Sequence, residues 1–358
     1  MIDKNKIMEA LSGVMDPELK RSLTELDMIK SVDIDGGKVM VEVSLTIAEC
    51  PLKKKIADDV EAAVRKVEGV EEVEVKLGTM TAEQRKNLTK KIYGKDHKAE
   101  AAAQGKEAAT AGDFADRVIC VASGKGGVGK STVTSNLAGA LAKLGFKVGV
   151  LDADVYGFSI PRIFGVGGQP TAIDNHIVPI RKHDIQIISI GFFVDENTPV
   201  IWRGPLLHKT VNQFISDVLW DKLDFLLIDL PPGTGDVTIS IAQALPKAEI
   251  LVVTTPQPLA SHTAGRVAKM AEQTKLSVLG VIENMSFYET NGKKEYIFGK
   301  DGGKDLATYL KVPFIGEVPI RTEIRESADN GNLIALSESD DASKYYIDLA
   351  TKVAGTKS

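Results

Sequence analysis

The residues best suited to phosphate chemistry lie together in one short segment of the chain. This segment, Gly124–Thr132, reads Gly-Lys-Gly-Gly-Val-Gly-Lys-Ser-Thr and fits the pattern G-x-x-x-x-G-K-[ST]. Glycines let successive backbone N–H groups turn toward phosphate oxygens, the final lysine reaches the β- and γ-phosphates, and the serine hydroxyl is offered to Mg²⁺. The segment therefore predicts a site for ATP and magnesium. Its residues are Gly124, Lys125, Gly126, Gly127, Val128, Gly129, Lys130, Ser131 and Thr132.

The flanking sequence supplies the structural context that this motif requires. Val118–Ala122 is a continuous apolar run, as expected of a buried parallel strand, and a second such run is Lys147–Asp152. Between them, apolar residues recur at helical spacing after Ser131 and end at Gly145. The alternative, a glycine-rich loop with no ligand, fits this order of strand, loop, helix and strand poorly.

Acidic residues follow two of the predicted strands. Asp229 ends the apolar run Phe225–Ile228, where a nucleotidase holds magnesium through water, and Pro231–Gly235 then forms a turn suited to sensing the γ-phosphate. Asp152 ends the strand Lys147–Asp152, and Asp154 lies just beyond it, at the tip. From these positions we expect Asp154 to orient or deprotonate the attacking water and Asp152 to support magnesium. The alternative for all three is a simple turn-capping role.

Asn284 follows a third predicted strand, Val278–Glu283. Its side-chain amide is placed to contact the adenine edge, although asparagine after a strand is also a common turn residue.

Composition limits the class of protein. The chain has 358 residues and a formal net charge of −5, which argues against a dominant nucleic-acid-binding face. No apolar run is long enough to cross a bilayer, and Met1–Lys4 is not expected to begin a signal peptide. The two cysteines, Cys50 and Cys120, form no disulfide framework, so a reducing cytoplasm is the expected location.

Hydrophobic patterning divides the chain into three parts. Residues 1–78 show helix–strand–strand–helix–strand patterning, typical of a small α+β domain. Residues 79–113 are rich in Lys, Glu, Ala, Gln and Gly and predict a flexible linker. Residues 114–358 alternate buried strands, including Phe225–Asp229 and Ile250–Thr254, with helices, which predicts an α/β, doubly wound parallel sheet of the P-loop NTPase type.

Together these motifs resemble the Mrp/ApbC family of iron–sulfur cluster carrier ATPases, within the MinD-like class with a deviant Walker A loop. The resemblance covers nearly the whole chain. It rests on Ser123–Thr132, Leu151–Gly157, Trp202–Pro205, Ile228–Asp236, Glu283–Ser286, Ile297–Gly299, and Cys50–Lys53 with Leu45-Thr46.

The resemblance implies functions that the patterns alone do not reach. Lys125 would cross a homodimer interface to the partner's nucleotide, and hydrolysis would be coupled to rearrangement of the dimer. Likewise, Lys130 and Ser131 would hold phosphates and magnesium, Asp154 would manage water, and Asn284 would contact adenine. The expected partners are a second copy and apo iron–sulfur proteins or assembly scaffolds, with no membrane or nucleic acid.

One departure from the family concerns the cluster ligands. Members that carry clusters commonly have a Cys-x-x-Cys pair shortly after the Asn-Met-Ser motif, but residues 287–296 of this chain contain no cysteine. Thiolates are the usual cluster ligands, so the usual ligation is impossible here. Cys50, near a predicted helix start, is the remaining candidate ligand, with a quiet structural cysteine as the alternative.

Four functions remain open on the sequence alone. The first is an ATPase that carries or assembles iron–sulfur clusters, and the second is a metal-free, nucleotide-switched regulator or scaffold of the same family. A positioning ATPase of the partitioning type would need attachment to DNA or membrane, and the segment Tyr345–Lys357 is too short and too weakly basic for a membrane helix. A nitrogenase-reductase-like electron carrier would need bridging cysteines.

Overall fold

The computed structural model describes residues 2–46, 52–93, 114–155, 157–173, 176–194, 204–233, 236–257, 260–290 and 292–356. The predicted sites at Cys50, Trp202-Arg203 and Thr234-Gly235 lie outside these residues. The chain divides into two compact units, Met1–Glu107 with Thr171–Val178, and Ala108–Pro170 with Pro179–Ser358. The short strands β6 (Ala172–Ile173) and β7 (His176–Ile177) belong to the first unit.

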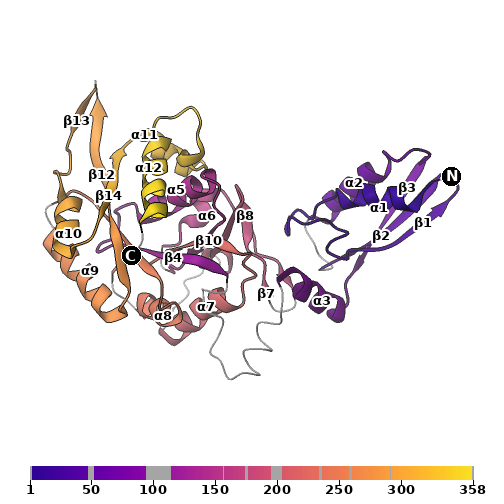
Figure 1. The fold of residues 1–358 in the computed structure, drawn as a ribbon, viewed down its shortest axis with the longest axis horizontal. Coiled ribbons are helices and arrows are strands. Elements are labelled where there is room, and N and C mark those ends of the chain that lie inside the picture. Colours follow the sequence, from indigo (N-terminus) through magenta and orange to yellow (C-terminus); the bar gives the residue numbers. More distant parts are fainter. Residues whose placement is uncertain are drawn as a thin grey trace. The chain divides into compact units, whose positions relative to one another are not determined.

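The N-terminal unit is an α+β fold, as predicted (Figure 1). Its elements are α1 (Lys4–Ser12), β1 (Ile29–Asp35), β2 (Lys38–Leu45), α2 (Lys53–Val64), β3 (Glu72–Thr79) and α3 (Ala82–Tyr93). β2 pairs antiparallel with β1 and parallel with β3. Alternate residues of β2, including Val39, Val41 and Val43, are buried, as is the face of α2 that carries Ile56 and Val60.

The helix α3 corrects the prediction of a linker over residues 79–113. β3 extends to Thr79, and α3 follows almost at once. Thr81 and Gln84 form a capping box, in which Thr81 N donates to Gln84 Oε1 (2.8 Å) and Gln84 N donates to Thr81 Oγ1 (3.2 Å). Leu88 is buried and Lys91 pairs with Asp27 at 2.6 Å. One buried leucine is too weak a periodic signal to find, whereas the Thr-x-x-Gln cap is visible in the sequence. Residues 94–113 lie outside the described residues.

The second unit contains a nine-stranded sheet in the order β13-β12-β11-β4-β10-β5-β9-β8, with β14 also pairing with β12. The strands are β4 (Ala115–Ala122), β5 (Val148–Asp152), β8 (Ile180–Lys182), β9 (Ile185–Ser189), β10 (Leu223–Asp229), β11 (Glu249–Thr254), β12 (Ser277–Thr290), β13 (Lys293–Glu295) and β14 (Phe314–Ile320). Only β8 and β13 pair antiparallel with their neighbours, among the strands that the structure describes. The predicted parallel sheet is confirmed.

Helices cover both faces of this sheet, which makes it doubly wound (Figure 1). One layer contains α5 (Lys130–Lys143), α6 (Ile160–Phe164), α11 (Thr322–Asp329) and α12 (Ser343–Gly355), with the short 3-10 helix η3 (Ile334–Leu336). The other contains α7 (Gly204–Ser216), α8 (Asp236–Ala244), α9 (Ala260–Thr274) and α10 (Gly302–Leu310). Leu137 and Leu141 of α5 pack with Val150 and Leu227 of the sheet in the core between α5 and the strands.

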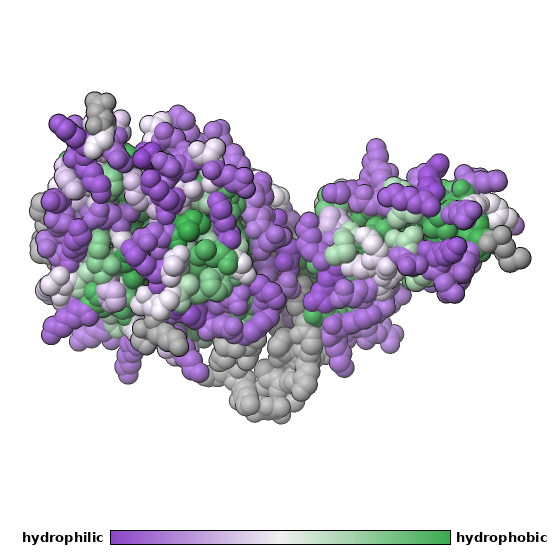
Figure 2. Space-filling view, turned by 45° about the horizontal axis from the view of Figure 1, so that its top comes forward, coloured by the Kyte–Doolittle hydropathy of each residue, from purple (hydrophilic) through white to green (hydrophobic). Residues whose placement is uncertain are grey.

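The exterior shown in Figure 2 is mainly hydrophilic, with smaller apolar areas on each unit. Among the described helices, none is both long and apolar enough to span a membrane.

Candidate functional site: a phosphate-binding pocket at the carboxyl ends of parallel strands

Strand order brings the predicted chemical residues together. β4, β10 and β5 are adjacent and parallel, so their carboxyl ends meet at one edge of the sheet. The register pairs Asp229 with Asp152 directly across β10 and β5. The loop that follows β4 runs past the same edge and enters α5 at Lys130.

The loop has the backbone shape that its glycines allow. Gly127 (φ 76°) and Gly129 (φ 80°) are both in the left-handed region, and Gly129 caps the N-terminus of α5. Around Gly127 there is open space, whereas a Cβ on Gly129 would lie 2.3 Å from Asn284 Nδ2. The Gly129 position therefore requires glycine for two independent reasons.

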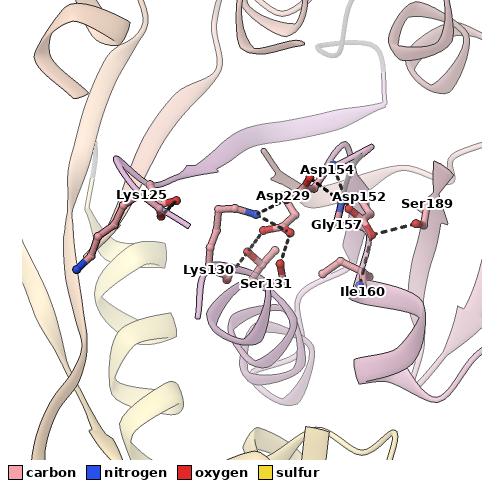
Figure 3. Close-up of polar contacts among 11 residues, drawn as sticks. Lys125, Lys130, Ser131, Asp152, Asp154, Gly157, Ile160, Ser189 and Asp229 are labelled. Atoms are coloured by element: carbon pink, nitrogen blue, oxygen red, sulfur yellow. Dashed lines mark hydrogen bonds and ion pairs between the residues drawn. The ribbon is translucent and has the colours of Figure 1, made fainter. Parts of the chain in front are cut away.

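Lys130 lies at the centre of a buried charge network (Figure 3). Its Nζ is 2.8 Å from Asp229 Oδ2 and 4.0 Å from Asp154 Oδ2. Asp229 is fully buried and also accepts hydrogen bonds from Ser131 Oγ (2.6 Å) and Thr134 Oγ1 (2.9 Å). Two carboxylates beside one ammonium group give this interior negative charge, which a divalent cation is suited to neutralise.

Above this network is a pocket of about 270 Å³. The phosphate loop from Gly126 to Thr132 forms one wall, and the other lining residues are Ser123, Asp154, Gly157, Ser159 and Pro232. Asp154 Oδ1 accepts a hydrogen bond from Gly157 N at 3.1 Å. Asp154 therefore lies at the pocket, and its role in handling the attacking water remains a prediction.

Asp152 was predicted to support magnesium, but its position in the structure does not fit that role. Its Oδ1 accepts from Asp154 N (3.1 Å), and its Oδ2 accepts from Ser189 Oγ (2.9 Å) and Ile160 N (3.3 Å). It is fully buried and does not line the pocket. Burial, together with the nearby charge of Asp229, raises the pKa of its carboxyl group. Alternation along a strand does not separate the two residues, because residues two apart lie on the same face. β5 ends at Asp152, and its three hydrogen-bond donors hold its carboxylate inside the protein, so Asp152 supports the loop and does not face a ligand.

Lys125 lies apart from this network. Its side chain points away from Lys130 in Figure 3, and its Nζ donates to Gln257 Oε1, just beyond β11. Arg266 of α9 donates to Gly124 O at 3.0 Å, which fixes the start of the loop on the same side. The two lysines of the loop thus have different surroundings within one chain.

Asn284 was expected to follow a strand and to contact adenine, but it lies within β12, which continues to Thr290. Met285 has φ 55°, and the pairing with β14 shifts register between Asn284 and Tyr288, so the strand kinks and continues. The buried Asn284 side chain donates from Nδ2 to Val128 O at 2.8 Å. In this structure Asn284 therefore holds the phosphate loop, and its contact with adenine remains a prediction.

Sequence reasoning missed Gln257, Thr134 and Ser189. Thr134 lies one helical turn after Lys130 on α5, so helical spacing could have placed it beside Asp229. Gln257 follows β11 and Ser189 ends β9, both at the carboxyl edge of the sheet. No local pattern distinguishes either from an ordinary polar residue.

The described residues offer few ligands for a metal cluster. They contain no group of three or more His, Cys, Asp or Glu suited to holding a metal ion. Cys120 is fully buried in β4, and burial raises the pKa of its thiol to about 12. Residues 288–290 and 293–295 pair as a β12–β13 hairpin, and Lys294 Nζ lies 3.7 Å from the centroid of the buried Phe287 ring. Cys50 lies outside the described residues.

Comparisons with known proteins agree with this geometry. Residues 115–354 match the family model of the NUBPL iron-transfer P-loop NTPase, and residues 4–77 match a model described as iron-sulfur cluster assembly protein. An iron-sulfur cluster carrier protein of Mycobacterium leprae is 47% identical over 94% of this chain and 88% of its own length. One from Synechocystis is 38% identical over 99% of this chain and 98% of its own length.

Two solved structures resemble part of this chain. A nucleotide-binding protein from Archaeoglobus fulgidus in complex with ADP is 38% identical, with a TM-score of 0.56 over 65% of this chain and 92% of that one. The cell division ATPase MinD of Pyrococcus furiosus is 23% identical, with a TM-score of 0.50 over 67% of this chain and 98% of that one, and shares the fold.

Proposed function

The chain belongs to the NUBPL iron-transfer P-loop NTPase family, and on this premise we propose that it is an ATPase that carries or assembles iron–sulfur clusters for apoproteins. One observation carries the nucleotide half of the proposal. Lys130, Ser131 and Asp154 line a single pocket, and the buried Asp229 holds Lys130 in place behind it. Preorganised charges of this kind stabilise developing phosphate charge without reorganisation.

Magnesium fits the donor set beneath the phosphates. Ser131 Oγ and Asp229 Oδ2 are 2.6 Å apart, and a hydroxyl with a carboxylate matches the oxygen ligands that Mg²⁺ prefers. Ser131 would bind the ion directly, and Asp229 would hold it through a water molecule. Bound there, the ion would neutralise charge on the β- and γ-phosphates.

Hydrolysis uses residues of this chain in distinct roles. Asp154 orients a water molecule toward the γ-phosphorus and accepts its proton. The water oxygen bonds to the γ-phosphorus as the bond from that phosphorus to the bridging oxygen breaks, which releases ADP and phosphate. Lys130 balances the charge that develops on the transferring group. Asn284 keeps the loop in place through Val128 and is the candidate contact for the base.

A homodimer completes the site in this proposal. Lys125 points away from the phosphate pocket of its own chain and is held by a neutral amide, so it is available to a neighbouring copy (Figure 3). A cation supplied across an interface makes turnover depend on dimer assembly.

The cluster is the cargo, and Cys50 is its proposed contact. Thiolates hold iron–sulfur clusters, and the chain has only two cysteines. A buried thiol such as Cys120, with its raised pKa, does not ionise near neutral pH. Two copies would bring two Cys50 thiols, so we expect a cluster to be held weakly and passed on readily.

The two cysteines provide a matched experiment. After anaerobic reconstitution, we expect the wild-type chain and Cys120→Ala to retain iron and to activate an apo iron–sulfur enzyme, and Cys50→Ser to do neither. If all three retain equal iron, Cys50 has no role in ligation. If none retains iron or activates the enzyme, the chain does not carry clusters directly.

The alternative is a metal-free, nucleotide-switched regulator or scaffold. The absence of cysteine from residues 287–296 favours it. This function predicts ATP-dependent capture of partner proteins from iron-free preparations, with the same result for wild type and Cys50→Ser. For either function we propose a location in the reducing cytoplasm, because the chain has only two cysteines and no disulfide framework.

A further inference from the structure

Ser189 is a buried residue that lies outside the phosphate pocket but is hydrogen-bonded to a residue close to it. It ends β9 and is fully buried. Its Oγ donates to Asp152 Oδ2 at 2.9 Å and accepts from Gly191 N at 3.0 Å, at the start of the 3-10 helix η2 (Ile190–Phe192). One hydroxyl group thus joins β9 and η2 to the end of β5.

Asp152 extends this connection to both ends of the loop that carries Asp154. Besides Ser189, it accepts from Asp154 N (3.1 Å) and from Ile160 N (3.3 Å), the first residue of α6. The backbone on either side of the Asp154 carboxylate is therefore tied to one buried side chain (Figure 3). Ser189 fixes the orientation of that side chain.

A second contact joins the same segments independently. A Cβ placed on Gly191 would lie 2.4 Å from Phe158 Cδ2, so the Phe158 ring packs directly on the η2 backbone. Phe158 lies between Gly157, which donates to Asp154 Oδ1, and Ser159, which lines the phosphate pocket. Hydrogen bonding and packing thus both set the position of this loop against η2.

We propose that Ser189, acting through Asp152, is a positioning residue for ATP hydrolysis that aligns the Asp154 carboxylate with the attacking water. The inference rests on the proposed role of Asp154. Ser189 and Asp152 do not line the pocket, so they act on the geometry of the reaction and not on nucleotide affinity. Small displacements of a reacting group lower rates strongly while leaving binding contacts in place.

The test separates kcat from nucleotide binding. In the full-length protein, we expect Ser189→Ala to lower kcat by about tenfold to a hundredfold, with the Kd for a non-hydrolysable MgATP analogue changed less than about threefold. Gly191→Ala, which displaces Phe158, is expected to act in the same direction. The matched control is Ser135→Ala, which removes a buried hydroxyl of α5 that has no hydrogen-bond partner within the described part of the chain, and should leave kcat unchanged.

Asp154→Ala is measured alongside these variants. If it abolishes hydrolysis while Ser189→Ala retains the wild-type kcat, the positioning role of Ser189 is wrong and that of Asp154 stands. If Asp154→Ala hydrolyses ATP normally, the proposed role of Asp154 fails. A loss of analogue affinity in Ser189→Ala as large as its loss in kcat would also overturn the inference, since it would indicate general damage to the pocket.

Discussion

Lys130 and Lys125 belong to the same loop, but the structure places them in opposite surroundings. Lys130 is buried and lies 2.8 Å from the Asp229 carboxylate, so its ammonium group has a fixed position. Lys125 is half-buried and contacts the neutral side chain of Gln257. A cation held by a buried carboxylate is costly to move, whereas one held by an amide exchanges partners at small cost. The first is suited to a permanent site, and the second to a contact made only during turnover.

The largest effect is expected from Lys130→Met. Loss of the ammonium group removes phosphate contacts and leaves Asp229 buried without its cation, so we expect ATP affinity to fall by at least about a hundredfold. The free energy of unfolding should fall by about 3 kcal/mol. Calorimetric titration and urea unfolding measure the two effects. Lys143→Ala, at the far end of the same helix, should change neither, and wild-type affinity in Lys130→Met would remove the basis of the assigned pocket.

Lys125→Ala should give the opposite profile. We expect normal stability and normal ATP affinity, with kcat lowered by a factor on the order of 10³, the range seen when a cation supplied in trans is removed.

A second measurement, which tests whether Lys125 acts across the dimer interface, mixes Lys125→Ala with Asp154→Ala. A mixed dimer has one competent site, made of the first variant's pocket and the second variant's Lys125. Half the dimers in an equal mixture are mixed, so roughly a quarter of wild-type activity should return.

No recovery in that mixture, from two variants that each bind ATP and dimerise, would show that Lys125 acts within its own chain. The comparison between the two lysines would then need revision.

The smallest expected effect concerns two glycines of the loop with similar backbones. Gly129→Ala combines a left-handed φ with a contact of 2.3 Å to Asn284 Nδ2, so we expect it to cost about 1–3 kcal/mol of stability and to weaken ATP binding. Gly127→Ala, with open space around it, should cost about 1–2 kcal/mol. Thermal unfolding and nucleotide titration compare them. Adding Asn284→Ala should restore part of the loss at Gly129 only; equal losses at both glycines would mean that the Asn284 contact is unimportant.

Local sequence was sufficient to find the chemistry of the phosphate loop. The order of Gly124–Thr132 dictates its turns, and apolar runs on either side dictate the strand and helix that position it. The structure brings Asp229 and Asp154 close to Lys130, as expected for residues at the carboxyl end of buried parallel strands, and their roles with magnesium and water remain predictions. The helix over Ala82–Tyr93 was missed because, among its described residues, Leu88 alone is buried, and one residue makes no periodic apolar pattern.

Tertiary structure alone decided which of these polar groups face the ligand. Spacing could not show that Asp152 turns toward Ser189, that Asn284 holds Val128, or that Lys125 meets Gln257. Each of these contacts joins segments that belong to, or directly follow, different strands, and the hydrogen bond exists only after the sheet has set the strand order and register. Local sequence fixes backbone turns and helix starts because they depend on neighbouring residues, but buried polar groups take whichever partner the assembled sheet brings within reach.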